Sequence, residues 1–160
     1  MKTLPALVVG FLALTGLPTG LHADNVVHPA LKDALVVSAK KDVEKFDDAA
    51  LKDVKYYAVY YSASWCGPCR AFTPDLVTWY KRNKKKNPHF ELIFVSSDRS
   101  AGDMAAYMKD DNMEWPALAF DKKSSVSALT KYSGRGIPCL VLLTRQVNRG
   151  FRRHVECVLP

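Results

Sequence analysis

The sequence predicts an α/β sandwich, in which a central sheet carries helices on its faces. Three apolar runs with strand character, at 56–62, 90–96 and 139–144, alternate with segments of helical periodicity. The first run has no polar alternation, which is typical of a strand that is buried on both faces. The chain shows no internal repeat, low-complexity tract or long linker, and we therefore expect a single domain.

The length and composition agree with one compact domain. The chain has 160 residues, of which 48% are hydrophobic, and a formal net charge of +7. The densest basic cluster, Lys81–Lys86, contains no aromatic side chain, so we expect no nucleic-acid binding. We interpret this cluster as the solvated C-terminal end of a helix, where cations complement the helix dipole.

The first 23 residues are typical of a secretory signal peptide. Lys2 supplies a positive start, the stretch from Leu4 to Leu17 is apolar, and Leu21-His22-Ala23 resembles a cleavage site. The alternative is an uncleaved N-terminal anchor. With cleavage, the mature chain is a domain of residues 24–160 without a transmembrane span. It would be exported to an oxidising compartment, either the periplasm or the extracellular space.

The same signals assign the other elements in chain order. We expect strands at 34–37 and 43–46, a short helix at 49–51 capped by Asp47 or Asp48, the strand at 56–62, a helix from about Cys66 to 83–87, the strand at 90–96, helices at 101–110 and 124–132, and the strand at 139–144. The polar residues at 97–100 can cap the helix at 101–110. That helix should bury Met104, Ala105, Tyr107 and Met108 in the core.

Two cysteines, Cys66 and Cys69, stand where the central strand ends and the long helix begins. The first turn of a helix has unpaired N–H groups and a positive dipole end, and both favour a thiolate over a thiol. The spacing brings both sulfurs within disulfide reach, and Gly67 and Pro68 suit the turn at a helix start. A permanent structural disulfide that closes so short a loop would stabilise the folded state only a little. A zinc site would need further ligands at matching spacing. We therefore expect a redox-active pair and no metal.

The residues around this pair resemble the thioredoxin fold, and within it the tryparedoxin and nucleoredoxin branch. The resemblance rests on Trp65-Cys66-Gly67-Pro68-Cys69 with Pro74 five residues on, on Ile137-Pro138 before a late strand, and on the segments Phe94–Asp98 and Trp115-Pro116. It extends from about residue 35 to residue 143. It implies a three-layer sandwich with a central mixed sheet.

The resemblance also implies a role for each residue near the cysteines. Cys66 would attack a substrate disulfide as a thiolate, and Cys69 would resolve the mixed disulfide. Trp65 would line the substrate contact surface, with a core position as the alternative. The Ile137-Pro138 pair resembles the cis-proline segment that faces the cysteines and binds an extended substrate through its backbone. Tyr60 stands where thioredoxin has a buried aspartate, and it would either handle a proton or pack in the core.

The C-terminal end departs from this family. Residues 145–160 are basic and atypical, and a strand at 151–158 would leave no room for the terminal helix of the fold. One apolar sheet face would then be bare. A truncated or frame-altered end would explain the sequence equally well. A hairpin centred on Asn148 would place Cys139 opposite Cys157, which gives the hypothesis of a second disulfide, with a small buried Cys139 as the alternative.

Together these features predict an exported thiol–disulfide oxidoreductase that works as a protein-disulfide reductase. The Gly-Pro dipeptide between the cysteines carries the reductase preference, by resemblance to reducing thioredoxins. The only redox group would be the Cys66–Cys69 pair itself, without a cofactor. Its partners would be disulfide-containing protein substrates and an electron donor that the sequence does not identify. The alternatives are a disulfide oxidase or isomerase of secreted proteins and a non-catalytic thioredoxin-like interaction module.

Overall fold

The computed structural model of the chain describes residues 29–40, 42–146 and 150–153. The predicted signal peptide lies outside the described residues. The strands are β1 (Leu35–Ser38), β2 (Val43–Lys45), β3 (Tyr56–Ser62), β4 (Phe90–Ser96), β5 (Ala117–Leu118), β6 (Cys139–Gln146) and β7 (Gly150–Arg153). The helices are α1 (Gly67–Asn83), α2 (Ala101–Asp110) and α3 (Ser127–Thr130), with 3-10 turns at 29–31, 48–51, 84–86 and 120–122.

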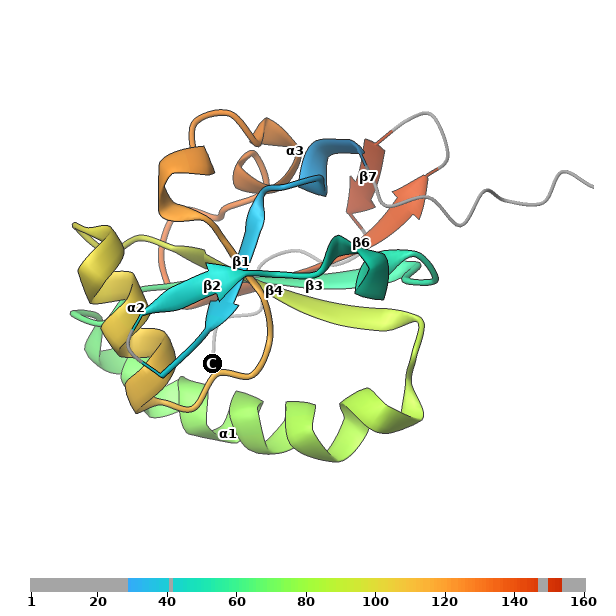
Figure 1. Cartoon of the computed structure of the whole chain (residues 1–160). Coiled ribbons are helices and arrows are strands. Elements are labelled where there is room, and N and C mark those ends of the chain that lie inside the picture. The colour runs from blue at the N-terminus through green and yellow to red at the C-terminus, as the bar shows by residue number, and fades with distance from the viewer. Residues whose placement is uncertain (1–28, 41, 147–149, 154–160) are drawn as a thin grey trace, which may run out of the picture.

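The strands form one mixed sheet in the order β2-β1-β5-β4-β3-β6-β7. β3 pairs in parallel with β4 and antiparallel with β6, so it lies inside the sheet. Helices α1 and α2 cover one face and α3 lies on the other, as Figure 1 shows. The predicted three-layer sandwich with a central mixed sheet is therefore confirmed.

The alternation of side chains along β3 explains why its sequence is apolar throughout. Ala58 and Tyr60 belong to the core cluster under α1 and α2. Tyr57, Val59 and Tyr61 belong to the cluster on the opposite face. Because both faces of the strand are buried at residues 57–61, these positions favour apolar and aromatic side chains.

Local sequence signals determine where α1 and α2 begin. Cys66 caps α1 with extended backbone, and Pro68 lies in the first turn, where its missing N–H costs no hydrogen bond. Ser100 caps α2, since its hydroxyl accepts the Asp103 N–H at 3.0 Å. The predicted bounds of α2 and its buried face are confirmed.

One prediction for the second half of the chain was wrong in extent. The helix expected at 124–132 is only four residues long, because the chain forms a 3-10 turn and a bend before it. The two-residue strand β5 was not predicted. The edge strand expected at 151–158 begins at Gly150 and pairs antiparallel with β6. Its continuation beyond residue 153, the terminal helix and Cys157 lie outside the described residues.

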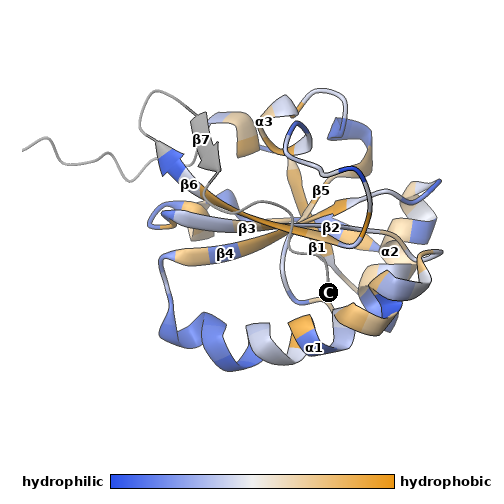
Figure 2. Ribbon diagram, turned by 180° about the vertical axis from the view of Figure 1, so that it is seen from behind, coloured by the Kyte–Doolittle hydropathy of each residue, from blue (hydrophilic) through white to orange (hydrophobic). Residues whose placement is uncertain are grey.

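An open apolar groove of about 870 Å³ crosses the α1 face of β3, β4 and β6. Figure 2 shows hydrophobic strands above α1 and hydrophilic residues at the C-terminal end of that helix. Tyr56 and Trp79, which are 48% and 46% exposed, lie on the groove. The sequence led us to expect an apolar sheet face left bare by the C-terminal end, and that end lies outside the described residues. The groove is lined by Tyr56, Ala58, Phe72, Asp75, Leu76, Trp79, Asn87, Phe90, Leu92, Leu140 and Leu142.

Leu142→Lys should weaken the binding of an apolar fluorescent dye to the folded protein. Leu142 lines the groove and is only partly buried, so a lysine there can reach water and should cost about 1 kcal/mol or less. The matched control is Leu143→Lys, because Leu143 is fully buried on the opposite face and should unfold the domain. Dye titration measures the affinity for the dye, and urea unfolding measures the change in stability. Unchanged dye binding by the Leu142 variant would show that the groove does not take apolar ligands.

Candidate active site

The two cysteines lie at the corner between β3 and α1 and are joined in a disulfide, with their Cα atoms 5.2 Å apart. Cys66 retains 6% of its surface, whereas Cys69 is fully buried. The Cys69 N–H points at the Cys66 sulfur across 3.3 Å, and the Arg70 N–H donates to the Cys66 carbonyl oxygen at 3.0 Å. An anion on the Cys66 sulfur would therefore gain a backbone hydrogen bond and the positive end of the helix dipole.

The loop before β6 brings a second segment against the disulfide. The peptide bond between Ile137 and Pro138 is cis, as the sequence predicted. The Ile137 carbonyl oxygen lies 3.7 Å from the Cys66 sulfur, and the Ile137 side chain packs on the buried cysteines and Ala63. The segment expected to face the cysteine pair does so, although it is 71 residues away in the chain.

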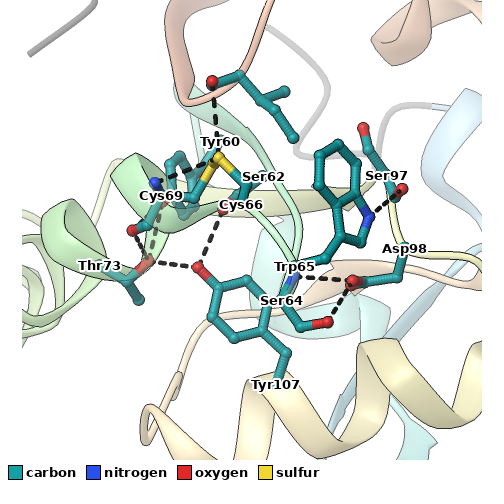
Figure 3. Close-up of a disulfide and its surroundings, with 11 residues drawn as sticks. Tyr60, Ser62, Ser64, Trp65, Cys66, Cys69, Thr73, Ser97, Asp98 and Tyr107 are labelled. Carbon is teal, nitrogen blue, oxygen red and sulfur yellow. Dashed lines mark hydrogen bonds between the residues drawn. A yellow bond between two sulfur atoms is a disulfide. The ribbon is translucent and has the colours of Figure 1, made fainter.

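Trp65 projects into solvent beside the disulfide and is 59% exposed, so the alternative of a core tryptophan is wrong. Its indole N–H donates to the Ser97 carbonyl oxygen at 3.3 Å (Figure 3). Gly67 and Pro68 are exposed as well. Cys66 is therefore flanked by exposed residues and by an aromatic ring held in place, which suits contact with a polypeptide.

A buried carboxylate holds the loop that carries Trp65. Asp98 is 5% exposed, and one of its oxygens accepts the Ser64 N–H at 2.7 Å and the Ser64 hydroxyl at 2.8 Å. Its other oxygen accepts the Ser96 hydroxyl at 2.7 Å. The segment after β4 thus clamps the segment after β3. The sequence indicated this residue as the end of the segment Phe94–Asp98 that carries the family resemblance and as part of a polar segment before a helix, without a role at the site.

Lys123 supplies a positive charge to the same corner of the sheet. Its ammonium group donates to the Ser96 carbonyl oxygen at 3.0 Å and lies 3.8 Å from the centre of the Phe120 ring. Burial lowers the pKa of Lys123, and the negative charge of Asp98 acts in the opposite direction. The buried carboxylate therefore has a cation nearby, which lowers the cost of its charge.

Four buried hydroxyls, those of Tyr60, Ser62, Thr73 and Tyr107, lie close to the disulfide, as Figure 3 shows. Thr73 Oγ1 lies 2.8 Å from the Cys69 carbonyl oxygen, 2.9 Å from the Tyr60 hydroxyl and 2.6 Å from the Tyr107 hydroxyl. The Ser62 hydroxyl lies 3.0 Å from that of Tyr107. Sequence reasoning placed Tyr60 here but missed the other three. A buried tyrosine needs a partner for its hydroxyl, and this need was the available signal for Tyr107.

Burial shifts the acidity of several tyrosines. It raises the pKa of Tyr57 to about 12, and it also raises the pKa values of Tyr80 and Tyr107. Their folded-state pKa values therefore lie above the unfolded value of about 10. The stability that these groups contribute is complete below pH 10 and is lost as the pH rises through the folded values.

We therefore expect the domain to unfold between about pH 10 and pH 12, with these buried tyrosines ionising only as it unfolds. Absorbance at a phenolate wavelength and far-ultraviolet circular dichroism, recorded on the same samples, measure the two events. Ionisation of the buried tyrosines should coincide with the loss of secondary structure. Complete phenolate formation in a protein that stays folded would contradict the prediction.

Other candidate groups lie away from this corner. The His89 ring nitrogen Nδ1 lies 2.9 Å from the Asp53 carbonyl oxygen, at the opposite end of the sheet.

Within residues 29–40, 42–146 and 150–153, no group of three or more His, Cys, Asp or Glu side chains could hold a metal ion. In the same ranges, no helix combines the length and apolar character needed to cross a membrane.

Known proteins share both the sequence and the architecture. A family model described as thioredoxin-like matches residues 53–149. A probable nucleoredoxin 1 of Arabidopsis thaliana is 45% identical over 89 residues, covering 56% of this chain and 15% of the relative. A tryparedoxin of Trypanosoma brucei brucei is 44% identical over 87 residues, covering 53% of this chain and 58% of the relative.

Solved structures agree with these sequence matches. Tryparedoxin I from Leishmania major superposes with a TM-score of 0.60 at 35% identity, covering 79% of this chain and 82% of that chain. The chain spans 15% to 26% of the length of the nucleoredoxins it matches, so the likeness concerns one domain of those proteins. The matched residues include the whole corner described above, from β3 through the Ile137-Pro138 loop to β6. The chain therefore belongs to the thioredoxin-like family.

Proposed function

We propose that this protein is an exported thiol–disulfide oxidoreductase that reduces disulfides in protein substrates. The observation that carries the proposal is the Cys66–Cys69 disulfide at the start of α1, in which Cys66 keeps 6% exposure beside the exposed Trp65 and Cys69 is fully buried. Cys66 can meet a substrate, and Cys69 can only meet its partner. A two-cysteine exchange mechanism requires one accessible attacking cysteine and one shielded resolving cysteine.

The reaction proceeds in two exchanges. The Cys66 thiolate attacks one sulfur of the substrate disulfide, so that a mixed disulfide forms and the other substrate sulfur leaves as a thiolate that takes up a proton. The Cys69 thiolate then attacks the Cys66 sulfur, the bond to the substrate breaks, and the second substrate thiol is released. The substrate gains two electrons and two protons, and the enzyme is left with its own disulfide. The pair carries the electrons without a further cofactor, and a thiol donor must reduce it again.

The surroundings of Cys66 support a polypeptide substrate. The exposed Trp65 ring offers an apolar contact, and the Ile137 backbone beside the cis-proline can pair with an extended chain. The apolar start of the sequence, Met1–Ala23, is the basis for export to the periplasm or the extracellular space.

Insulin reduction by dithiothreitol tests the activity. The wild type should accelerate insulin precipitation, and Cys66→Ser should remove the acceleration. Equal rates for both proteins would favour a non-catalytic interaction module, for which the apolar groove over β3, β4 and β6 is the candidate surface.

The reduction potential of the cysteine pair tests the direction. Thioredoxin-like reductases lie near about −270 mV, isomerases near about −180 mV and strong oxidases near about −120 mV. A value close to the first supports the proposed reductase. A value close to the last would assign the protein to disulfide formation instead.

A further inference from the structure

The buried hydroxyls under Cys69 can be assigned donors and acceptors by counting protons. A hydroxyl has one proton to donate and two lone pairs that accept. The Cys69 carbonyl oxygen can only accept, so Thr73 donates its single proton there across 2.8 Å. The close contacts of Thr73 with the Tyr60 and Tyr107 hydroxyls must then be bonds that both tyrosines donate to Thr73.

The same proton count assigns the hydrogen bonds of the hydroxyls around Thr73. Tyr107 has used its proton, so the Ser62 hydroxyl donates to Tyr107 across 3.0 Å. The Tyr60 hydroxyl also lies 3.4 Å from the Cys69 carbonyl oxygen, and its one proton already serves Thr73. Every proton of the four hydroxyls is committed, and both lone pairs of Thr73 are occupied. Thr73 is therefore the centre of the network, with three hydrogen bonds.

This chemistry favours positioning over proton transfer. Serine and threonine hydroxyls do not ionise near neutral pH, and burial raises the pKa of Tyr107 above its ordinary value. The bonds end on the backbone of Cys69, on the helix turn that carries its sulfur. The adjacent Pro74 has no N–H and so leaves the α1 hydrogen-bond ladder one bond short. The missing bond would run to the Arg70 carbonyl oxygen, whereas the Thr73 hydroxyl bonds the Cys69 carbonyl oxygen of the same turn.

We propose that Thr73 is a positioning residue for Cys69, and that Tyr60 and Tyr107 hold Thr73 in place. The inference rests on the proposed two-step exchange and concerns its second step. Cys69 must approach the Cys66 sulfur in line with the bond to be broken, and a displaced helix turn would lower the rate. The first step, attack by Cys66, uses a sulfur that the network does not touch. The network should therefore affect the two steps unequally.

A reaction with one equivalent of dithiobis(nitrobenzoate) separates the steps. Attack by the reduced Cys66 forms a mixed disulfide and releases one thionitrobenzoate anion. Attack by Cys69 on the Cys66 sulfur closes the enzyme disulfide, releases the second anion and gives the Cys69 proton to solvent. The Cys69→Ser variant should release only the first, and it identifies any contribution from other cysteines.

Thr73→Val should slow the second release about tenfold and change the first less than about twofold, because it removes the buried hydrogen bond to Cys69 and the oxygen to which both tyrosine hydroxyls donate. Thr73→Ser keeps the hydroxyl and should restore the second release. Tyr60→Phe and Tyr107→Phe each remove one of the three bonds and should give intermediate rates. They also keep the test available if Thr73→Val does not fold, as checked by circular dichroism.

Tyr80→Phe is the matched control. Tyr80 is also a buried tyrosine and belongs to α1, but its hydroxyl donates to Glu91 at 2.7 Å, away from Cys69. It should lower stability without slowing either release. A normal second release in the folded Thr73 and tyrosine variants would overturn the inference, as would equal slowing by Tyr80→Phe. Wild-type inactivity on insulin would overturn the proposed reductase alone, because the two releases are measured without insulin.

Discussion

Replacing Cys69 with serine should convert the protein into a trap that holds its substrates as mixed disulfides. Cys66 would still attack, since its sulfur keeps the Cys69-position N–H and the helix dipole. The protein would then have no resolving thiolate at this site, and release would need an external thiol. We expect turnover in insulin reduction to fall by roughly a thousandfold, because the two cysteines act as one unit. Non-reducing gels should show covalent adducts that dithiothreitol removes.

Cys66→Ser is the matched variant for this experiment. It should lose as much turnover but form no adducts, because the remaining Cys69 is fully buried and cannot reach a protein disulfide. The contrast between the two variants tests the assignment of nucleophile and resolving residue. Equal adduct formation by both would show that either sulfur meets the substrate, contrary to the burial in the structure.

Much of the fold could be predicted because its main strands and helices have local signatures. The bounds of β3, β4 and α2 were predicted correctly from apolar runs and a capping segment. β5 could not be found in this way. It has two residues, and it exists because Leu118 and Ala117 pair with β1 while Ala117 also pairs with β4. Strand pairing across the sheet decides such an element, and a local pattern carries no information about it.

The residues of the site likewise fall into those that a local motif identifies and those that only the tertiary structure brings in. Cys66, Trp65 and the Ile137-Pro138 pair stand in motifs, and the structure brings them together at one corner. Asp98 and Tyr107 reach that corner from segments more than thirty residues away. A serine-aspartate pair after a strand and a tyrosine on a helix are common in any domain. Only the pairing of β3 with β4 places them beside the cysteines.

Asp98→Ala should cause both a loss of stability and a loss of activity. The substitution leaves the Ser64 N–H and the hydroxyls of Ser64 and Ser96 without their acceptor in a buried place. The expected cost is about 3 kcal/mol of unfolding free energy, since each unsatisfied buried group costs about 1 kcal/mol or more. Ser64 directly precedes Trp65, so the substrate contact should loosen and insulin reduction should slow by roughly tenfold. Urea unfolding and the insulin assay measure the two effects.

Asp98→Asn separates the geometry of this clamp from its charge. The amide oxygen can still accept both Ser64 donors, and the amide nitrogen can donate to Ser96 if that hydroxyl turns. Lys123 would lose the negative charge that opposes the fall of its pKa. If hydrogen bonding to Ser64 is what holds Trp65, the asparagine variant should keep most of the activity and lose about 1 kcal/mol. Asp103→Ala, at an exposed acid in the first turn of α2, should change neither quantity by more than about 1 kcal/mol or twofold. An asparagine variant as inactive as the alanine variant would instead assign the role of Asp98 to its charge.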